Sequence, residues 1–146
     1  VGASGMVLKS TDAGGHWTRI RHGATHALLI SVAFADDTTL VAVGADGTIV
    51  RSGDGGATWS RRTTGTMSWL WDVAFADAKH GIAVGYSGVW ITTDDGGLTW
   101  HARHIDEATG LTAIRFTSPT EGLVFGGPAG LVMRVSRTAT PGASNE

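Results

Sequence analysis

One phrase of eight residues occurs three times in this chain, and its spacing constrains the fold more than any other feature of the sequence. The copies lie at 10–17, 52–59 and 93–100, and each ends on a tryptophan. These tryptophans are 42 and 41 residues apart (59 − 17 and 100 − 59). A fixed period of about 40 residues, with strand-like sequence between the copies, is typical of a propeller-type array in which each repeat is one supersecondary unit.

Other markers keep the same period. A Val-Gly-x-x-Gly segment precedes each copy at 1–5, 43–47 and 84–88, and 125–130 is a looser fourth version of it. Three phenylalanines also follow one another at intervals of 41 residues: Phe34, Phe75 and Phe116. Because several independent markers share one period, the repeat covers most of the chain.

The fourth unit loses the repeated phrase. Ser136, Arg137 and Thr138 stand where Ser-x-Asp is expected, and no tryptophan follows them. We therefore predict a repeat domain over residues 1–137 and a flexible C-terminal tail over 138–146.

Within the unit 69–109, alternation and turn residues predict four short antiparallel strands. The first strand places three residues on one face, namely Trp71, Val73 and Phe75. The other strands are expected at 82–84, which is apolar enough to be buried on both faces, at 89–92 and at 100–104. Four such strands form one propeller blade. No stretch has helical periodicity, so the predicted fold class is all-β.

The blade units are expected at about 1–27, 28–68, 69–109 and 110–135. The two middle units are whole blades, whereas the first holds only later strands and the last only early strands. If these end pieces pair, the chain holds about three four-stranded blades, fewer than the four to eight usual in a closed ring. We therefore predict an open arc or an incomplete propeller.

The open edges of such an arc need cover. A partner protein, a second copy of the chain or further blades of a larger propeller could supply it, and we favour the partner. The chain also opens at Val1 in the middle of a repeat, so we expect a segment upstream.

Each position of the repeated phrase has a structural reason. An Asp two residues after Ser or Thr can accept hydrogen bonds from nearby backbone N–H groups and close a turn. The glycines allow positive φ in that turn, and the tryptophan is expected to pack between blades. The structural residues of the three copies are Ser10, Asp12, Gly14, Trp17, Ser52, Asp54, Gly56, Trp59, Thr93, Asp95, Gly97 and Trp100.

The aspartates of the phrase could instead be catalytic carboxylates or calcium ligands. Equivalent turns on separate blades cannot converge on one substrate, and the Asp94–Asp95 pair lacks the spacing of a calcium loop. The six histidines show no metal-ligand spacing. We therefore expect no catalytic residue, no metal site and no cofactor.

Composition limits the possible partners and cellular compartments only partly. The formal net charge of −2 implies neither nucleic acid nor an anionic membrane surface as a partner. No apolar run approaches the length of a membrane span, and no signal peptide is visible. The absence of cysteine leaves the redox compartment open.

The segment after each repeated tryptophan is basic, and it is expected to form the outermost strand of its blade. Its arginines are candidate partner-binding residues: Arg19, Arg21, Arg61, Arg62 and Arg103. Arginine suits bidentate pairing with carboxylates at an interface. Charged outer strands can equally serve to prevent edge-to-edge aggregation, and the sequence leaves both interpretations open.

Two further tryptophans lie at the start of the third unit. Trp71 is expected in the core on the innermost strand. Trp69 stands at the strand entry, where it could either pack in the core or protrude as an aromatic anchor for a partner.

The unit Val-Gly-x-x-Gly followed by Ser/Thr-x-Asp-x-Gly-x-Thr-Trp resembles the Asp-box (BNR) repeat. Together with the segments 81–85 and 94–100, it is most similar to the photosystem II assembly and stability factor family of propellers, over residues 1–135. The resemblance implies a non-catalytic, periplasmic or lumenal protein that docks on a photosynthetic reaction centre or its antenna. The family forms a larger closed ring than this chain can build. This departure favours a small, permanently bound extrinsic subunit over an assembly factor.

Two other functional classes are compatible with the same repeat. Asp-boxes also occur in sialidase-like glycosidases, but such a site needs an arginine cluster, a Tyr nucleophile and an acid. Here Tyr86 is the single tyrosine, and the arginines lie mostly on outer strands. The other rival is a secreted or surface propeller that binds glycan or protein, with Trp69 or Trp90 as an exposed stacking platform. A homo-oligomer is possible where no other partner is bound.

Overall fold

The computed structural model describes residues 1–105, 110–127 and 130–136, and the predicted tail 138–146 lies outside them. These residues form thirteen strands and two single turns of 3-10 helix, η1 (Ala3–Gly5) and η2 (Ala45–Gly47). The strands are β1 (Val7–Lys9), β2 (Thr18–Ile20), β3 (Leu29–Phe34), β4 (Leu40–Gly44), β5 (Ile49–Ser52), β6 (Ser60–Arg62), β7 (Leu70–Phe75), β8 (Gly81–Gly85), β9 (Val89–Thr93), β10 (His101–His104), β11 (Leu111–Ser118), β12 (Glu121–Gly126) and β13 (Leu131–Ser136).

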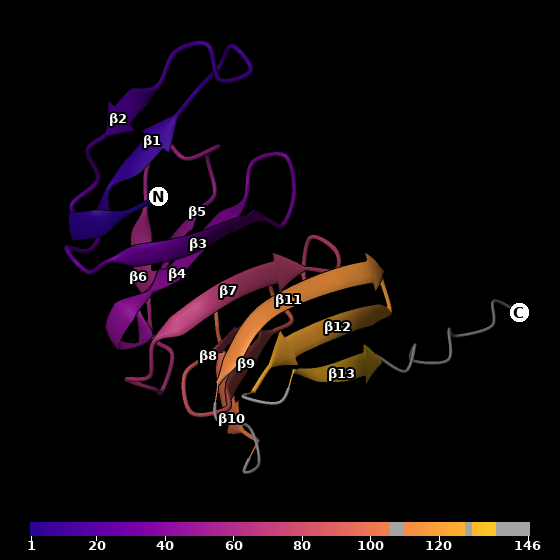
Figure 1. The fold of residues 1–146 in the computed structure, drawn as a ribbon. Coiled ribbons are helices and arrows are strands. Elements are labelled where there is room, and N and C mark those ends of the chain that lie inside the picture. Colours follow the sequence, from indigo (N-terminus) through magenta and orange to yellow (C-terminus); the bar gives the residue numbers. More distant parts are fainter. Residues whose placement is uncertain (106–109, 128–129, 137–146) are drawn as a thin grey trace, which may run out of the picture.

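The strands form four antiparallel sheets in chain order. Two are four-stranded, β3-β4-β5-β6 and β7-β8-β9-β10, and they lie between a two-stranded β1-β2 hairpin and a three-stranded β11-β12-β13 sheet. Figure 1 shows the sheets following one another along an arc, with β7 between β3 and β11, which it contacts on either side. The predicted fold class is confirmed: the chain is all-β and forms part of a propeller of four-stranded antiparallel sheets.

The two end pieces do not pair into a third blade. The hairpin and the last sheet remain separate and lie at opposite ends of the arc (Figure 1). The physical reason is that β13 already pairs with β12. Strand β13 thus occupies the position beside β12 that β1 would have to fill if the two end pieces shared a blade.

The core lies between the sheets rather than within any one of them. Three buried clusters fill the three sheet-to-sheet boundaries. The central cluster, between the two four-stranded sheets, contains Val41, Val43, Ile49, Leu70, Val73, Ala83, Val89, Ile91 and Trp100. Every residue of β8 is buried, so this second strand is covered on both faces as predicted for 82–84, and the equivalent strand β4 is buried throughout as well.

A β-bulge corrects one prediction for the innermost strand. The pairing shifts between Leu70 and Asp72, which leaves Trp71 as the extra residue. Leu70 therefore packs with Val73 in the central core. The Trp71 ring lies instead edge-on to Tyr86, with 6.0 Å between ring centroids. The prediction that Trp71 is a core residue on the face of Val73 is wrong, because simple alternation does not anticipate the extra residue.

Candidate docking surface

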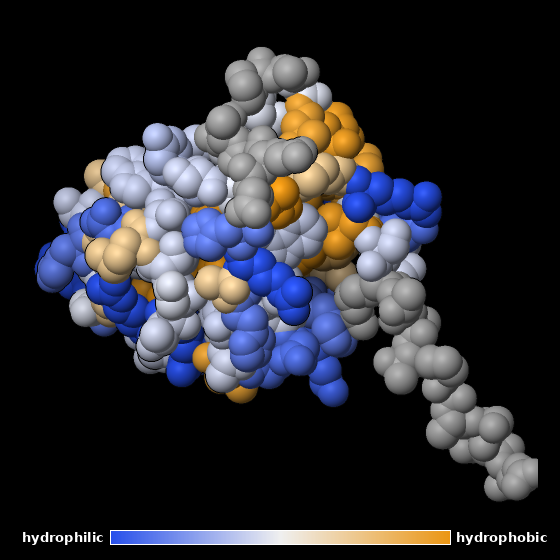
Figure 2. Space-filling model, turned by 90° about the horizontal axis from the view of Figure 1, so that it is seen from below, coloured by the Kyte–Doolittle hydropathy of each residue, from blue (hydrophilic) through white to orange (hydrophobic). Residues whose placement is uncertain are grey.

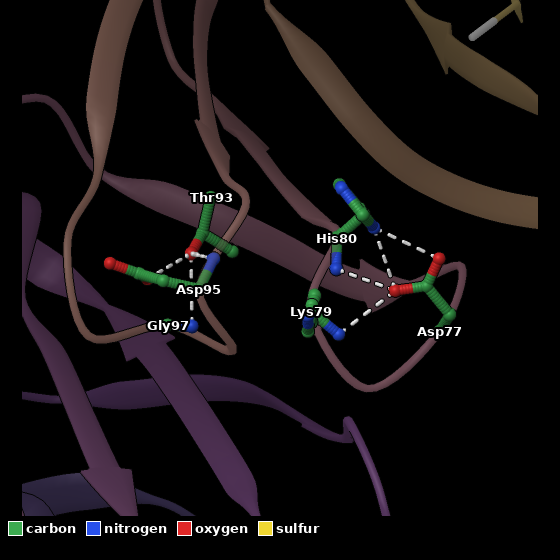
Figure 3. A network of polar contacts seen from close by, with 6 residues as sticks. All are labelled: Asp77, Lys79, His80, Thr93, Asp95 and Gly97. Atoms are coloured by element: carbon green, nitrogen blue, oxygen red, sulfur yellow. Dashed lines mark hydrogen bonds and ion pairs between the residues drawn. The ribbon is translucent and has the colours of Figure 1, made fainter. Parts of the chain in front are cut away.

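The Asp-box turns are closed by hydrogen bonds within each box. In the second box the Ser52 hydroxyl donates to Asp54 Oδ1 (2.8 Å) and accepts from the Gly56 N–H (2.8 Å). The other carboxylate oxygen accepts from the Thr58 hydroxyl (2.6 Å). The third box repeats these contacts with Thr93, as Figure 3 shows beside the neighbouring Asp77 turn.

The first box uses a different donor at one position. His16 stands where the other boxes have Thr, and its backbone N–H donates to Asp12 Oδ1 (2.8 Å). Its ring nitrogen Nδ1 lies 2.6 Å from Asp12 Oδ2. The same turn is therefore closed with an imidazole in place of a hydroxyl.

These hydrogen bonds shift the acidity of all three box carboxyls. The backbone N–H of His16 is the main cause that lowers the pKa of Asp12 to about 2. The Thr58 hydroxyl and backbone N–H lower the pKa of Asp54 to about 2. Burial opposes the shift at Asp95, but hydrogen bonds from Thr99 outweigh it and the pKa is again about 2. Each carboxylate is ionised at neutral pH and engaged by its own turn, which is the geometry of a structural group.

Two box tryptophans pack between sheets, and the third does not. Trp59 and Trp100 are 8% and 7% exposed, and their indole N–H groups donate to Gly56 O (3.0 Å) and Gly97 O (3.2 Å). Trp17 is 62% exposed. The prediction that every box tryptophan is covered is therefore wrong for Trp17. Trp59 and Trp100 are each covered by the sheet that precedes their own in the chain. The described residues contain no sheet before β1 that could cover Trp17 in the same way.

The predicted arginines lie on the outer strands. Strands β6 and β10 are the last strands of the four-stranded sheets, and β2 is the outer strand of the hairpin. These strands carry Arg19, Arg61, Arg62 and Arg103, and Arg21 follows β2. All of them are exposed except Arg62, which is half-buried. The buried Nε atom of Arg62 has no hydrogen-bond partner among the described residues. Among the described residues, none of the five forms an ion pair with a carboxylate.

Equivalent hollows lie beside two of these basic strands. Each is bounded by a 3-10 turn and by the chain that follows the outer strand. One has a volume of about 540 Å³ and is lined by Arg61 and Arg62 together with residues 63–67. The other has a volume of about 180 Å³ and is lined by Arg19, Arg21 and His22. The repeat thus places unpaired arginines at corresponding points of consecutive sheets, where acidic groups of a partner can reach them.

Trp69 lies at the surface, so the prediction that it could pack in the core is wrong. Trp69 is 45% exposed, and its backbone carbonyl accepts a hydrogen bond from the Tyr86 N–H (2.9 Å). Trp90, by contrast, is half-buried against the third core cluster. Of the two candidate stacking tryptophans, Trp69 is therefore the more exposed.

A polar link across the innermost strands was not predicted from the sequence. The buried Asp72 carboxylate accepts from the Ser31 hydroxyl (2.7 Å) of the preceding sheet and from the Ile114 N–H (3.0 Å) of the following one. The Arg115 guanidinium pairs with the same carboxylate. The 41-residue spacing of Ser31 and Asp72 was the available signal, because it places both at one position of the repeat. The link joins three sheets and positions the Arg115 side chain.

Two classes of feature are absent from the residues that the structure describes. None of their acidic and histidine side chains form a group of three that could hold a metal ion. In the same ranges, no helix is long or apolar enough to cross a membrane.

Comparison with known proteins supports the resemblance in the sequence. The sequence model of the family described as "Photosynthesis system II assembly factor YCF48" matches residues 63–139. No curated protein matches the chain. The solved structure of YCF48 from Cyanidioschyzon merolae superimposes with a TM-score of 0.74 at 21% identity, over 92% of this chain and 45% of that chain. A structure of YCF48 bound to D1 peptide gives a TM-score of 0.73 at 22% identity with the same coverages, 92% and 45%. At these identities the likeness shows the fold, and the chain spans less than half the length of either structure.

Proposed function

Because the chain belongs to the photosystem II assembly factor YCF48 family, we propose that it is a non-catalytic subunit that docks on the periplasmic or lumenal face of a photosynthetic reaction-centre complex. It either stabilises that complex or assists its assembly. Its partners are protein subunits of the reaction centre or its antenna. One structural neighbour is a YCF48 bound to a peptide, which supports a role in binding protein segments.

The exposed arginines of the outer strands are the observation that carries this proposal. Arg19 and Arg61 hold the same repeat position on consecutive sheets, and Arg103 lies one residue further along the third outer strand. All three are unpaired among the described residues. Arginine binds carboxylates bidentately and is enriched at protein interfaces. Such exposed groups on the outer strands can hold acidic segments of a partner, and this Coulomb attraction weakens with salt.

The test reverses charge on the rim without disturbing the fold. The variant Arg19→Glu, Arg61→Glu, Arg103→Glu changes only exposed side chains, whereas Arg62 is avoided because it is half-buried. Lys79→Glu is the matched control, since Lys79 is exposed on the turn between β7 and β8. We expect the triple variant to leave source membranes at about 0.15 M salt, where the Debye length is about 8 Å, and the control to stay bound. Retention of the triple variant at wild-type levels would overturn the proposal.

A second candidate function is favoured by the exposed ring of Trp69. A surface propeller that binds glycan would stack a sugar on this ring. Oligosaccharide titrations followed by tryptophan fluorescence test it, with Met67→Ala as a control because Met67 is exposed nearby in the chain. Saturable binding that Trp69→Ala abolishes supports glycan recognition, and an absence of binding to any oligosaccharide tried argues for the protein-docking function.

A further inference from the structure

The two ends of the sheets carry different turns. At one end, the turn between the second and third strands of a sheet is bonded to the segment that enters an innermost strand. The Gly47 N–H donates to Ser68 O (3.0 Å), and the Tyr86 N–H donates to Trp69 O (2.9 Å). The segment before β7 therefore joins turns of both four-stranded sheets. We call this end of the sheets, where β3, β7 and β11 begin, the turn end (Figure 1).

Three large apolar or aromatic side chains are exposed at the turn end. Met67 and Trp69, in the segment before β7, are 77% and 45% exposed. Tyr86, in the turn after β8, is 56% exposed. All three lie in or between the two four-stranded sheets, in the middle of the chain. Exposed side chains of this kind that gather on one surface indicate a contact site.

Arginines lie beside these side chains. Arg61, Arg62 and Met67 line the hollow of about 540 Å³ at the turn end, and Arg21 lines the equivalent hollow beside the β1-β2 hairpin. Asp46 is the only acidic residue in the described part of this end. Seen from below, the side on which β7 and β11 begin combines strongly hydrophilic residues with paler ones (Figure 2). The turn end is thus basic and carries exposed aromatic rings.

The opposite end of the sheets is acidic. There the Asp-box turns are bonded to the turns between first and second strands, since the Gly55 N–H donates to Thr38 O (2.8 Å) and the Gly96 N–H donates to Lys79 O (2.9 Å). We call this end the box end. Its turns carry seven aspartates: Asp12, Asp36, Asp37, Asp54, Asp77, Asp94 and Asp95. The formal net charge of −2 therefore conceals a separation of charge between the two ends.

We propose that the turn end binds the surface of a bilayer that contains anionic phospholipid. Trp69 and Tyr86 have amphipathic rings of the kind that lie at the level of lipid headgroups. Met67 enters the boundary between headgroups and acyl chains beside them. The guanidinium groups of Arg21 and Arg61 pair with lipid phosphates.

Charge favours anionic lipid as the partner and selects one orientation on it. An anionic leaflet attracts basic residues and repels acidic ones over about one Debye length, about 8 Å at physiological salt. Strand β8 has five residues and spans about 17 Å between the two ends. With the turn end on the bilayer, the arginines lie within reach of the surface charge and the aspartates of the box end lie beyond it.

This inference goes beyond the proposed function, because its ligand is lipid and not a protein subunit. Arg61 belongs to both surfaces, so the test uses vesicles that contain no protein. A failure to bind such vesicles leaves docking on reaction-centre subunits untouched. Release of the arginine variant from source membranes remains the separate test of the proposed function.

Flotation with lipid vesicles tests the proposal. One set of vesicles is an equimolar mixture of phosphatidylglycerol and phosphatidylcholine, and the other is phosphatidylcholine alone. Met67→Asp replaces an exposed apolar side chain with a carboxylate at the turn end. Leu98→Asp is the matched control, because Leu98 is 47% exposed in the third Asp-box and the change in charge is the same. Circular dichroism melts check that both variants fold.

We expect the wild type and Leu98→Asp to float with the phosphatidylglycerol vesicles and to bind phosphatidylcholine vesicles more weakly. Met67→Asp should bind the phosphatidylglycerol vesicles about tenfold more weakly than the wild type. A wild type that floats with neither set of vesicles would overturn the proposal. Equal weakening in Met67→Asp and Leu98→Asp would overturn it too, because binding would then not depend on the turn end.

Tryptophan quenching by lipid with brominated acyl chains shows which ring enters the bilayer. We expect the phosphatidylglycerol vesicles that carry this lipid to quench part of the wild-type fluorescence. This quenching should disappear in Trp69→Phe and persist in Trp17→Phe, because Trp17 is also exposed but ends the first Asp-box. Quenching that persists in Trp69→Phe and disappears in Trp17→Phe would overturn the proposal.

Discussion

The boundary between the two four-stranded sheets, which we call the central interface, and the β1-β2 hairpin are built from the same repeat, yet equivalent side chains in them have opposite environments. Trp100 and Ile91 are buried between sheets, whereas Trp17 and Leu8 at the same repeat positions face outward. The box turns beneath them are nevertheless closed by the same kind of hydrogen bonds. The repeat therefore specifies the local turn, and the neighbouring sheet alone decides whether the tryptophan is buried.

This difference shows where the stability of the arc arises. In repeat architectures the free energy is approximately a sum of unit terms and nearest-neighbour interface terms. Substituting a box residue that bonds only within its own turn should cost about the same in every copy, whereas substituting one that contacts the neighbouring sheet should cost much less where no such sheet is described. The predictions below compare equivalent residues of the repeat.

The largest contrast is expected for the box tryptophans. Trp100→Ala removes a buried side chain from the central interface, and we expect it to lower the free energy of unfolding by about 3–5 kcal/mol. Trp17→Ala removes an exposed side chain, and the expected change is within about 0.5 kcal/mol. Urea unfolding followed by circular dichroism measures both. Equal losses in the two variants would show that Trp17 is covered.

The box glycines give a smaller contrast. Gly97 and Gly14 both have positive φ, 81° and 91°. A Cβ at Gly97 would also meet Val41 at 2.8 Å, whereas at Gly14 the nearest atom is a Trp17 carbon at 3.8 Å. We expect Gly97→Ala to cost about 2–4 kcal/mol and Gly14→Ala about 1–2 kcal/mol. Urea unfolding measures both, and we expect the lower midpoint for Gly97→Ala. A lower midpoint for Gly14→Ala would contradict the role of the close approach between the sheets.

Substitutions of Arg51 and of its equivalent Arg134 should differ less in their effect on the free energy of unfolding. Arg51 donates across the central interface and is half-buried, so Arg51→Met should cost about 1 kcal/mol. Arg134 holds the same repeat position but pairs only with Glu121 at the surface. Arg134→Met should change the free energy of unfolding by less than about 0.5 kcal/mol. A larger loss at Arg134 than at Arg51 would contradict the equivalence.

The box carboxylates should show no contrast at all. Hydrogen bonds within each turn lower the pKa of Asp12 and Asp54 from 3.8 to about 2. The ionised form therefore stabilises the folded state above pH 3.8, and this stabilisation is lost as the pH falls toward 2. We expect Asp12→Asn and Asp54→Asn to flatten the acid limb of a plot of Tm against pH to the same extent. Asp36, whose pKa is also lowered to about 2, contributes to the limb in both variants.

Much of the fold could be predicted because the residues that close each turn are limited to a few types at fixed positions. The Asp-box needs an acceptor, a hydroxyl and positive-φ glycines at fixed spacing, so its copies are visible in the sequence. The burial of the second strand β8 was predicted because residues 82–84 are all apolar. The arginines of β6 and β10 were placed on outer strands because they follow the box tryptophans directly.

The features that the sequence did not reveal depend on neighbours or on a single inserted residue. The exposure of Trp17 depends on which sheet lies beside the β1-β2 hairpin, and nothing in the phrase 10–17 encodes that. The bulge at Trp71 shifts one residue out of alternation without a glycine to mark it. The burial of Asp72 depends on donors 41 and 42 residues away, Ser31 and Ile114, which meet it only in the folded arc.

Fluorine NMR of the chain labelled with 5-fluorotryptophan tests most directly the claim that the neighbouring sheet decides the environment of each box tryptophan. The six tryptophans give six resonances, which Trp→Phe variants assign. On exchange from H2O to D2O, we expect the Trp17 resonance to show the shift of an exposed ring while those of Trp59 and Trp100 stay nearly fixed. A shift at Trp17 as small as that at Trp100 would contradict the account.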